Sequence, residues 1–119
     1  MTTIGHLING QSIEVNERTQ DVFNPSNGEV SKQVALASKA TVESAIEAAQ
    51  AAYPAWRNTP AIKRARVMFK FKDLLEQNAD KICQLIGEEN GKISHDAAGE
   101  LQRGIENVEY ACCAPELLK

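Results

Sequence analysis

Apolar residues in the first part of the chain come in short runs separated by turn residues, a pattern that is typical of β-strands. Residues 7–13 place an Asn-Gly dipeptide between two such runs, and this dipeptide tolerates the positive φ angles that a tight hairpin turn requires. Residues 24–28, NPSNG, form a second turn sequence, because proline fixes one φ angle and glycine can adopt a left-handed one. We therefore predict a hairpin at residues 7–13, a second β pair around residues 24–28 and a polar connection at residues 14–19.

The period of the pattern changes after Ser38, where apolar residues begin to recur every three or four positions. This spacing predicts one stripe of an amphipathic helix, and Ser38 is placed to cap a helix that starts at Lys39. We expect Pro54 to end this helix, because proline lacks the N–H group that the helical ladder uses. The stripe consists of Val42, Ala45, Ile46, Ala49, Ala52, Tyr53 and Trp56.

Three further helices are predicted after this one. Residues 61–77 carry apolar side chains over more than half of the helical circumference, so we expect this helix to have neighbours on more than one side. Asn78 is placed to cap a third helix at residues 79–90, which an Asn-Gly pair ends. Ser94 is placed to cap a fourth helix that reaches about Cys112.

The order of the elements, strands first and helices afterwards, predicts the α+β class. We expect a small antiparallel β hairpin region at residues 1–37 and a helical region with about four helices at residues 38–119. The 119 residues, of which 43% are hydrophobic and 24% charged, fit one soluble globular domain.

The charge pattern and the apolar runs exclude two classes of partner. The net charge is -3, and the one dense basic cluster, Lys63, Arg64 and Arg66, is interpreted as a solvated helix face, so no nucleic acid is expected. No apolar run approaches the roughly 20 residues that cross a bilayer, and the first residues do not resemble a signal peptide. We therefore expect no membrane partner and a cytoplasmic location.

Residues with catalytic or metal-binding chemistry are few. The three cysteines are expected to be reduced thiols, and Cys112 lies on an apolar stripe, which favours a structural role over a nucleophilic one. Cys113 has no histidine near it in the sequence to activate it. With only His6 and His95 and no C-x-x-C spacing, no metal site is expected, and no glycine-rich phosphate loop is present.

The fourth predicted helix has an apolar and a polar face. Arg103 lies on the polar face, where it can pair with Glu100 or Glu106 in a surface contact that contributes a few tenths of a kcal/mol. Gly99 and Gly104 beside it would instead let another group approach the helix closely. Spacing alone favours the surface pair. The apolar face carries Leu101, Ile105, Val108 and Cys112, and the polar face carries Arg103, Asn107 and Tyr110.

Six segments, taken in order, resemble the start of the aldehyde dehydrogenase superfamily. The branch that they resemble most is the CoA-acylating methylmalonate-semialdehyde dehydrogenases, and the resemblance covers essentially the whole chain. The segments are INGQ (8–11), VFNPSNGEV (22–30), AAYPAW (51–56), RARVMFKFKDLLEQN (64–78), EENGK (88–92) and RGIENVEYA (103–111).

The resemblance implies an N-terminal fragment of the α/β aldehyde dehydrogenase fold, whose cofactor, catalytic and oligomerisation segments lie beyond Lys119. It implies no catalytic residue in this chain, so neither Cys112 nor Cys113 is the catalytic thiol. It also implies that Arg103 binds the carboxylate of the substrate, which reverses the interpretation from spacing.

The same resemblance implies a reaction for the parent enzyme. This enzyme would oxidise methylmalonate or malonate semialdehyde with NAD and CoA to propionyl-CoA or acetyl-CoA and CO2, in valine and inositol catabolism, as a homo-oligomer. The fragment alone is expected to bind neither cofactor and to be inactive.

Two alternatives stay open at this stage. The chain could be a fragment of a non-acylating aldehyde dehydrogenase, which CoA dependence of the intact protein would decide. It could also be a free-standing helical module that docks a partner protein through the apolar helix at residues 61–77, which a natural stop codon after Lys119 would support. That same apolar helix predicts that the isolated chain self-associates.

Overall fold

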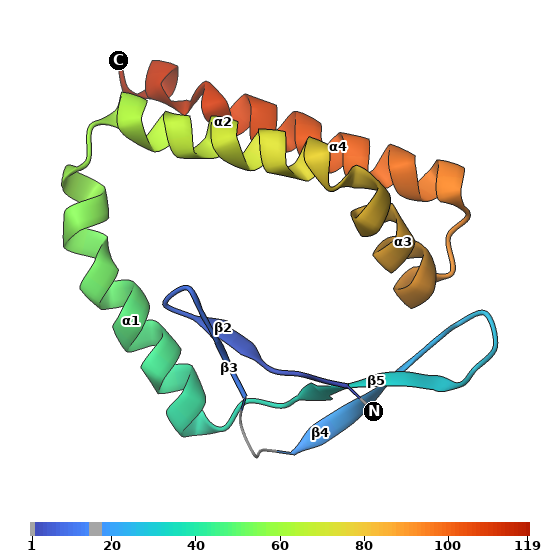
Figure 1. Cartoon of the computed structure of the whole chain (residues 1–119). Helices are drawn as coiled ribbons and strands as arrows, with labels where there is room; N and C mark the ends of the chain where they lie inside the picture. Colours follow the sequence, from blue (N-terminus) through green and yellow to red (C-terminus); the bar gives the residue numbers. More distant parts are fainter. Residues whose placement is uncertain (1, 15–17) are drawn as a thin grey trace. The chain divides into compact units, whose positions relative to one another are not determined.

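The computed structural model describes residues 2–14 and 18–119, and it divides the chain into two compact units, Met1–Arg57 and Asn58–Lys119. The first unit holds the strands and one long helix, and the second holds three helices and a short 3-10 helix (Figure 1). The polar connection predicted at residues 14–19 falls largely on residues 15–17, which lie outside the described residues. None of the helices in the described ranges has the length and apolar character needed to cross a bilayer.

The predicted hairpin is confirmed. Strands β2 (His6–Ile8) and β3 (Gln11–Ile13) pair antiparallel, and the turn between them contains Asn9 with φ 52° and Gly10 with φ 73°. These two positive φ angles are the conformation that an Asn-Gly turn provides with little strain.

The second β pair is also confirmed, and it gains a strand. Strands β4 (Thr19–Phe23) and β5 (Val30–Ala35) pair antiparallel around the turn at residues 24–28. β1 (Thr3–Ile4) pairs in parallel with β5, so the sheet order is β1-β5-β4. Only antiparallel pairs were expected, because a two-residue strand is too short to show an alternating pattern and its partner lies far along the chain.

Gly5 connects β1 to β2 at a point where two segments of backbone approach closely. A Cβ atom at this position would lie 2.3 Å from the carbonyl oxygen of Ile13, a distance at which no side chain fits. Glycine is required here because of this close approach.

Helix α1 (Lys39–Asn58) begins as predicted and ends later than predicted. The Ser38 Oγ atom accepts a hydrogen bond from the Thr41 N–H at 3.2 Å, which confirms the cap. The prediction that Pro54 ends the helix is wrong, since Pro54 lies inside it. Proline removes one hydrogen bond of the ladder, and the alanines at positions 51, 52 and 55, which are strong helix formers, carry the helix through.

The second unit has the predicted helices at the predicted positions. They are α2 (Ala61–Gln77), α3 (Ala79–Asn90) and α4 (Ser94–Cys112), followed by the 3-10 helix η1 (Ala114–Leu118), which was not predicted. Gly91 ends α3 in a left-handed conformation, and its N–H donates to the Gly87 carbonyl at 2.9 Å.

Two predicted helix caps in this unit are wrong. The Asn78 side-chain amide donates to the Leu74 carbonyl at 2.8 Å, so it satisfies the end of α2 and makes no cap bond to α3. Ser94 is the first residue of α4, and Ile93, which has no side-chain hydrogen bond to offer, stands at the cap position. In neither place does a side chain make the cap bond that the local sequence predicted, because Asn78 bonds to the preceding helix and Ser94 lies one position inside its own helix.

The apolar stripe of α4 packs against α2 and α3, and its residues are buried or half-buried (Figure 1). Small residues dominate this core, and they allow the helices to approach closely. Lys72 on α2 adds a polar link, because its Nζ atom lies 2.7 Å from a Glu76 carboxylate oxygen and 3.6 Å from one of Glu109 on α4. The buried core residues of the unit are Ala65, Ala97, Ile105 and Cys112.

In contrast, α1 buries no residue among those described. The large apolar residues of its stripe are all exposed, with Ile46 at 59%, Tyr53 at 57% and Trp56 at 46% of their accessible surface.

Candidate functional site

The polar face of α4 is held in place by the burial of the opposite face. Ile105 retains 5% of its accessible surface, and Cys112 retains 5%, so rotation of the helix about its axis would expose core side chains. Arg103, Asn107 and Tyr110 lie on the other side and are exposed, as predicted. The helix therefore presents Arg103 to open space in a fixed direction within this unit.

The guanidinium of Arg103 lies back along the helix toward residue 99. Its Nη1 atom is 4.0 Å from the place that a Cβ atom at Gly99 would occupy. This is the direction in which helical side chains usually lean. A Cβ atom at Gly104 would meet nothing within 4 Å, so no described residue makes the close approach that the sequence suggested there.

Neither neighbouring glutamate pairs with Arg103 in the part of the chain that the structure describes. Glu100 instead accepts a hydrogen bond from Lys92 and forms an ion pair with it. Glu106 accepts a hydrogen bond from the Gln102 amide at 3.4 Å. The surface pair that spacing alone favours is thus not formed, and the Arg103 side chain makes no hydrogen bond or ion pair with any described residue.

The electrostatics of Glu100 reflect the same arrangement. The hydrogen bond from Lys92 and then the charge of Lys92 hold the pKa of the Glu100 carboxyl below its ordinary value, and the charge of Arg103 contributes less. Arg103 is therefore near enough to influence Glu100 while Lys92 holds it.

Lys92 was missed by the sequence analysis. It lies in the connection between α3 and α4, eight residues before its partner, and the helical spacing rules that relate neighbours on one helix do not apply across a turn. The signal that was available is the glycine at position 91, whose positive φ turns the chain so that Lys92 reaches α4.

The thiols and histidines form no metal-binding group among the described residues. Cys112 is buried on the apolar stripe as predicted, Cys113 is exposed, and all three cysteines are free. No group of three potential metal ligands occurs within residues 2–14 and 18–119. His95 is exposed at the start of α4.

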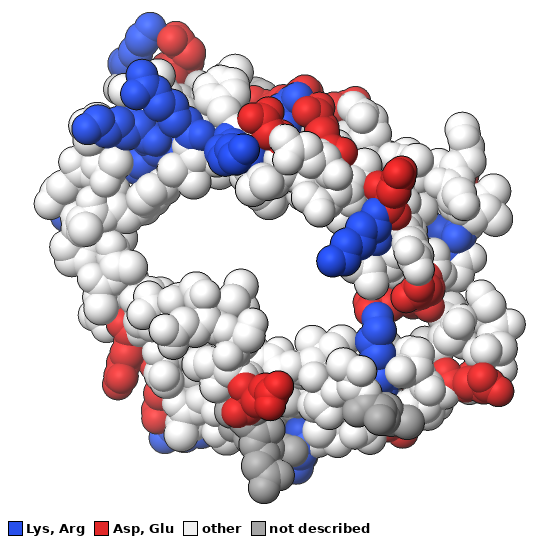
Figure 2. Space-filling view, viewed as in Figure 1, with Lys and Arg blue, Asp and Glu red and all other residues white. Residues whose placement is uncertain are grey.

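The basic cluster at the start of α2 consists of residues with different environments. Figure 2 shows lysine and arginine atoms gathered over the end of the second unit at which α2 begins. Lys63 and Arg66 are exposed, but Arg64 is half-buried and its Nε–H donates to the Thr59 carbonyl at 3.1 Å. Arg64 therefore holds the chain at the entry to α2, and the three residues do not form one open phosphate site.

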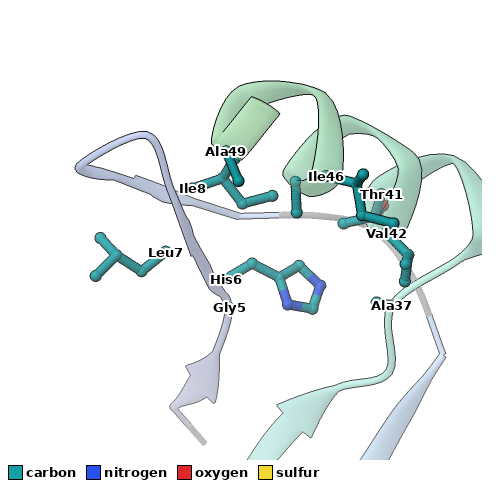
Figure 3. A pocket seen from close by; sticks show the side chains of 10 residues that line it. Gly5, His6, Leu7, Ile8, Ala37, Thr41, Val42, Ile46 and Ala49 are labelled. Carbon is teal, nitrogen blue, oxygen red and sulfur yellow. The ribbon is translucent and has the colours of Figure 1, made fainter. Parts of the chain in front are cut away.

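An open hollow of about 570 Å³ lies between β2 and the first half of α1. Figure 3 shows the His6 ring pointing into this space and the Leu7 side chain pointing away from it. Among the residues that line it, only His6 and Thr41 carry polar side-chain atoms, and the others are apolar or glycine. The hollow does not bring together the convergent polar groups that fix a small-molecule substrate, so the polar face of α4 is the better candidate site.

The comparisons with known proteins agree with one another. The aldehyde dehydrogenase family model matches residues 13–119. Over its full length the chain is 61% identical to a malonate-semialdehyde dehydrogenase from Pseudomonas aeruginosa, and it covers 24% of that protein.

Two solved structures are similar over the whole chain. A methylmalonate-semialdehyde dehydrogenase from Oceanimonas doudoroffii is 74% identical, with a TM-score of 0.98, and the chain covers 24% of it. A protein from Sinorhizobium meliloti 1021, described as a methylmalonate-semialdehyde dehydrogenase and complexed with NAD, is 40% identical, with a TM-score of 0.95 and the same 24% coverage. The chain thus spans about a quarter of the length of these relatives and matches the N-terminal part of their fold.

Proposed function

The chain belongs to the aldehyde dehydrogenase family, and we propose that it forms the N-terminal part of an enzyme that oxidises a semialdehyde carrying a carboxylate. The names of its close relatives support methylmalonate or malonate semialdehyde as the substrate. In the proposed reaction the aldehyde, NAD and CoA give propionyl-CoA or acetyl-CoA, NADH and CO2. In the whole enzyme, NAD would supply the hydride acceptor and CoA the acyl acceptor.

The observation that carries this proposal is the state of Arg103. Its guanidinium is exposed on a helix whose orientation is fixed by a buried stripe, and it has no carboxylate partner among the described residues. A planar guanidinium can bind a carboxylate through two parallel hydrogen bonds, and it stays charged at every pH of interest. We assign Arg103 as the residue that binds the carboxylate of the substrate.

A carboxylate held at one end of a short semialdehyde also positions its other end. The aldehyde carbon lies two bonds from the carboxylate carbon, so a bound carboxylate leaves it little freedom to move away from a reacting group. Cys112 cannot supply that group, since it is buried on the opposite face of α4. We propose that the nucleophile belongs to a part of the enzyme outside these 119 residues.

The described residues do not fit NAD or CoA. They include no glycine-rich loop before a helix that could hold a pyrophosphate, so we assign none of them to either cofactor and derive no step through them. For the same reason the 119-residue chain alone is proposed to be inactive.

The test is the variant Arg103→Ala in the full-length enzyme that contains this sequence. A hydrogen bond to a charged group contributes about 1.5 to 3 kcal/mol. Its loss corresponds to a fall in kcat/KM of roughly ten- to 150-fold for malonate semialdehyde. The activity toward propanal, which has no carboxylate, is expected to change little. Both are measured as initial rates of NADH formation, with and without CoA, because CoA dependence distinguishes the acylating reaction from a non-acylating one.

Two results would count against the proposal. An equal fall in kcat/KM for malonate semialdehyde and for propanal would mean that Arg103 does not bind the substrate carboxylate. NADH formation by the pure 119-residue chain, assayed alongside as a blank, would contradict the proposed inactivity.

A further inference from the structure

We propose that Lys92 is a positioning residue for Arg103. By pairing with Glu100, Lys92 keeps this carboxylate away from the guanidinium, and Arg103 stays open to the carboxylate of the substrate. This inference rests on the proposed function, because it needs Arg103 to bind a substrate carboxylate.

Glu100 is the natural partner of Arg103 on the helix. Residues three apart lie on neighbouring positions of the helix surface, and an acidic residue that precedes a basic one is the favourable order. The guanidinium already lies on this side, because its Nη1 atom is 4.0 Å from the Cβ position at Gly99. If Glu100 had no other partner, its carboxylate would be expected to form an ion pair with the Arg103 guanidinium.

Lys92 prevents this pairing from outside the helix. Gly91, with φ 73°, turns the chain between α3 and α4, and the next residue reaches the Glu100 carboxylate. The Lys92 side chain retains 33% of its accessible surface and the Glu100 side chain 43%, so both are partly covered, which reduces the screening of the pair by solvent. Glu100 is thus held on the side of α4 that faces the α3–α4 connection.

The charges of the three groups are consistent with an anionic ligand. Lys92, Glu100 and Arg103 together carry one net positive charge at neutral pH, which one substrate carboxylate would balance. Without Lys92 the remaining Glu100 and Arg103 would sum to zero, and an incoming carboxylate would have to displace Glu100. The other nearby carboxylate, that of Glu106, already accepts a hydrogen bond from Gln102.

The first test is Lys92→Met in the full-length enzyme, which removes the charge and keeps an unbranched side chain. We expect KM for malonate semialdehyde to rise roughly two- to fivefold, the effect of one exposed ion pair, while kcat and the kinetics with propanal stay unchanged. Lys72→Met is the matched control, because it removes a lysine that pairs with Glu76 and Glu109 and not with Glu100. The control is expected to leave the ratio of kcat/KM for malonate semialdehyde to kcat/KM for propanal as in the wild type.

Rescue separates positioning from a merely structural role. In the double variant Lys92→Met/Glu100→Gln the competing carboxylate is gone, so KM for malonate semialdehyde is expected to return to the wild-type value or below. Glu100→Gln alone is expected to lower that KM, since it leaves two cations uncompensated, and this variant tests the inference even if Lys92→Met does not fold.

The possible failures are distinguishable. If Lys92→Met leaves the ratio unchanged, if the double variant is no better than Lys92→Met, or if Glu100→Gln raises KM, the inference about Lys92 is wrong while the role of Arg103 stands. If Arg103→Ala itself affects malonate semialdehyde and propanal equally, the proposed function is wrong and the inference falls with it.

Discussion

Helices α1 and α4 have similar lengths and similar patterns, yet only α4 buries its apolar stripe. They contain 20 and 19 residues and each carries one stripe of apolar side chains. Ile105 of α4 retains 5% of its accessible surface, while Ile46 of α1 retains 59%. α4 lies against α2 and α3, whereas Val42, Ile46 and Ala49 of the α1 stripe line the open hollow beside β2.

The difference shows what a hydrophobic pattern can predict. Periodicity identifies the face of a helix that is apolar, because this depends only on the spacing of the side chains. Whether that face is covered depends on what else the protein contains, and this chain covers 24% of its close relatives. In the proposed enzyme we expect the α1 stripe to contact protein outside these 119 residues.

The largest expected effect comes from matched truncations in the two stripes. In the 119-residue chain, Ile105→Ala is expected to lower the free energy of unfolding of the second unit by about 2 to 5 kcal/mol, because it leaves a cavity in a packed core. Ile46→Ala, the same change on α1, is expected to change the stability by less than about 0.5 kcal/mol. Urea denaturation followed by helical circular dichroism measures both, and equal losses would break the comparison between the two helices.

The helices of the second unit were predictable because their signals are local. Pro60 precedes α2 and Gly91 follows α3. Each marks a helix end through its own backbone conformation, which needs no partner elsewhere in the chain. Caps were less predictable, because a side chain such as that of Asn78 lies between two helix ends and can bond to either one. Pro54 was misjudged for a related reason, since the flanking alanines outweigh a single breaker.

The candidate site was predictable in part. The position of Arg103 on the polar face of α4 follows from helical spacing alone. Helical spacing does not predict that Arg103 and Glu100 stay unpaired, because this depends on Lys92, which approaches from another segment of the chain. Spacing along one helix identifies the possible partners of a charge, and only the fold shows which of them is already taken.

A smaller effect is expected on association. The apolar residues of α2 predict that the isolated chain self-associates, and the exposed stripe of α1 adds further apolar surface. Ile46→Ser, within the α1 stripe, is expected to raise the dissociation constant roughly fivefold, which corresponds to about 1 kcal/mol. Tyr110→Ser is the control, because this residue is 71% exposed but lies on the polar face of α4. Sedimentation measures both, and a monodisperse monomer at every concentration would show that exposure of the stripe has no such consequence.

The smallest effect concerns the ion pair that joins the α3–α4 connection to α4. The pKa of Glu100 is held below its ordinary value of 4.5 by the hydrogen bond and charge of Lys92, so the folded state favours the ionised carboxylate. Its stabilising contribution is therefore fully present above pH 4.5 and is lost as the pH falls through the lowered pKa. The contribution is small, since the pair is partly exposed and salt screens it.

Glu100→Gln removes this titration, so the test compares the urea midpoints of wild type and variant between pH 7 and pH 3. The wild type is expected to be slightly more stable at pH 7, and the difference is expected to vanish in the acid range and at high salt. A difference that stays constant with pH would mean that Glu100 acts through packing. The charge balance proposed for Arg103 would then lose its basis, because it requires Glu100 to be held by Lys92 as an ionised carboxylate.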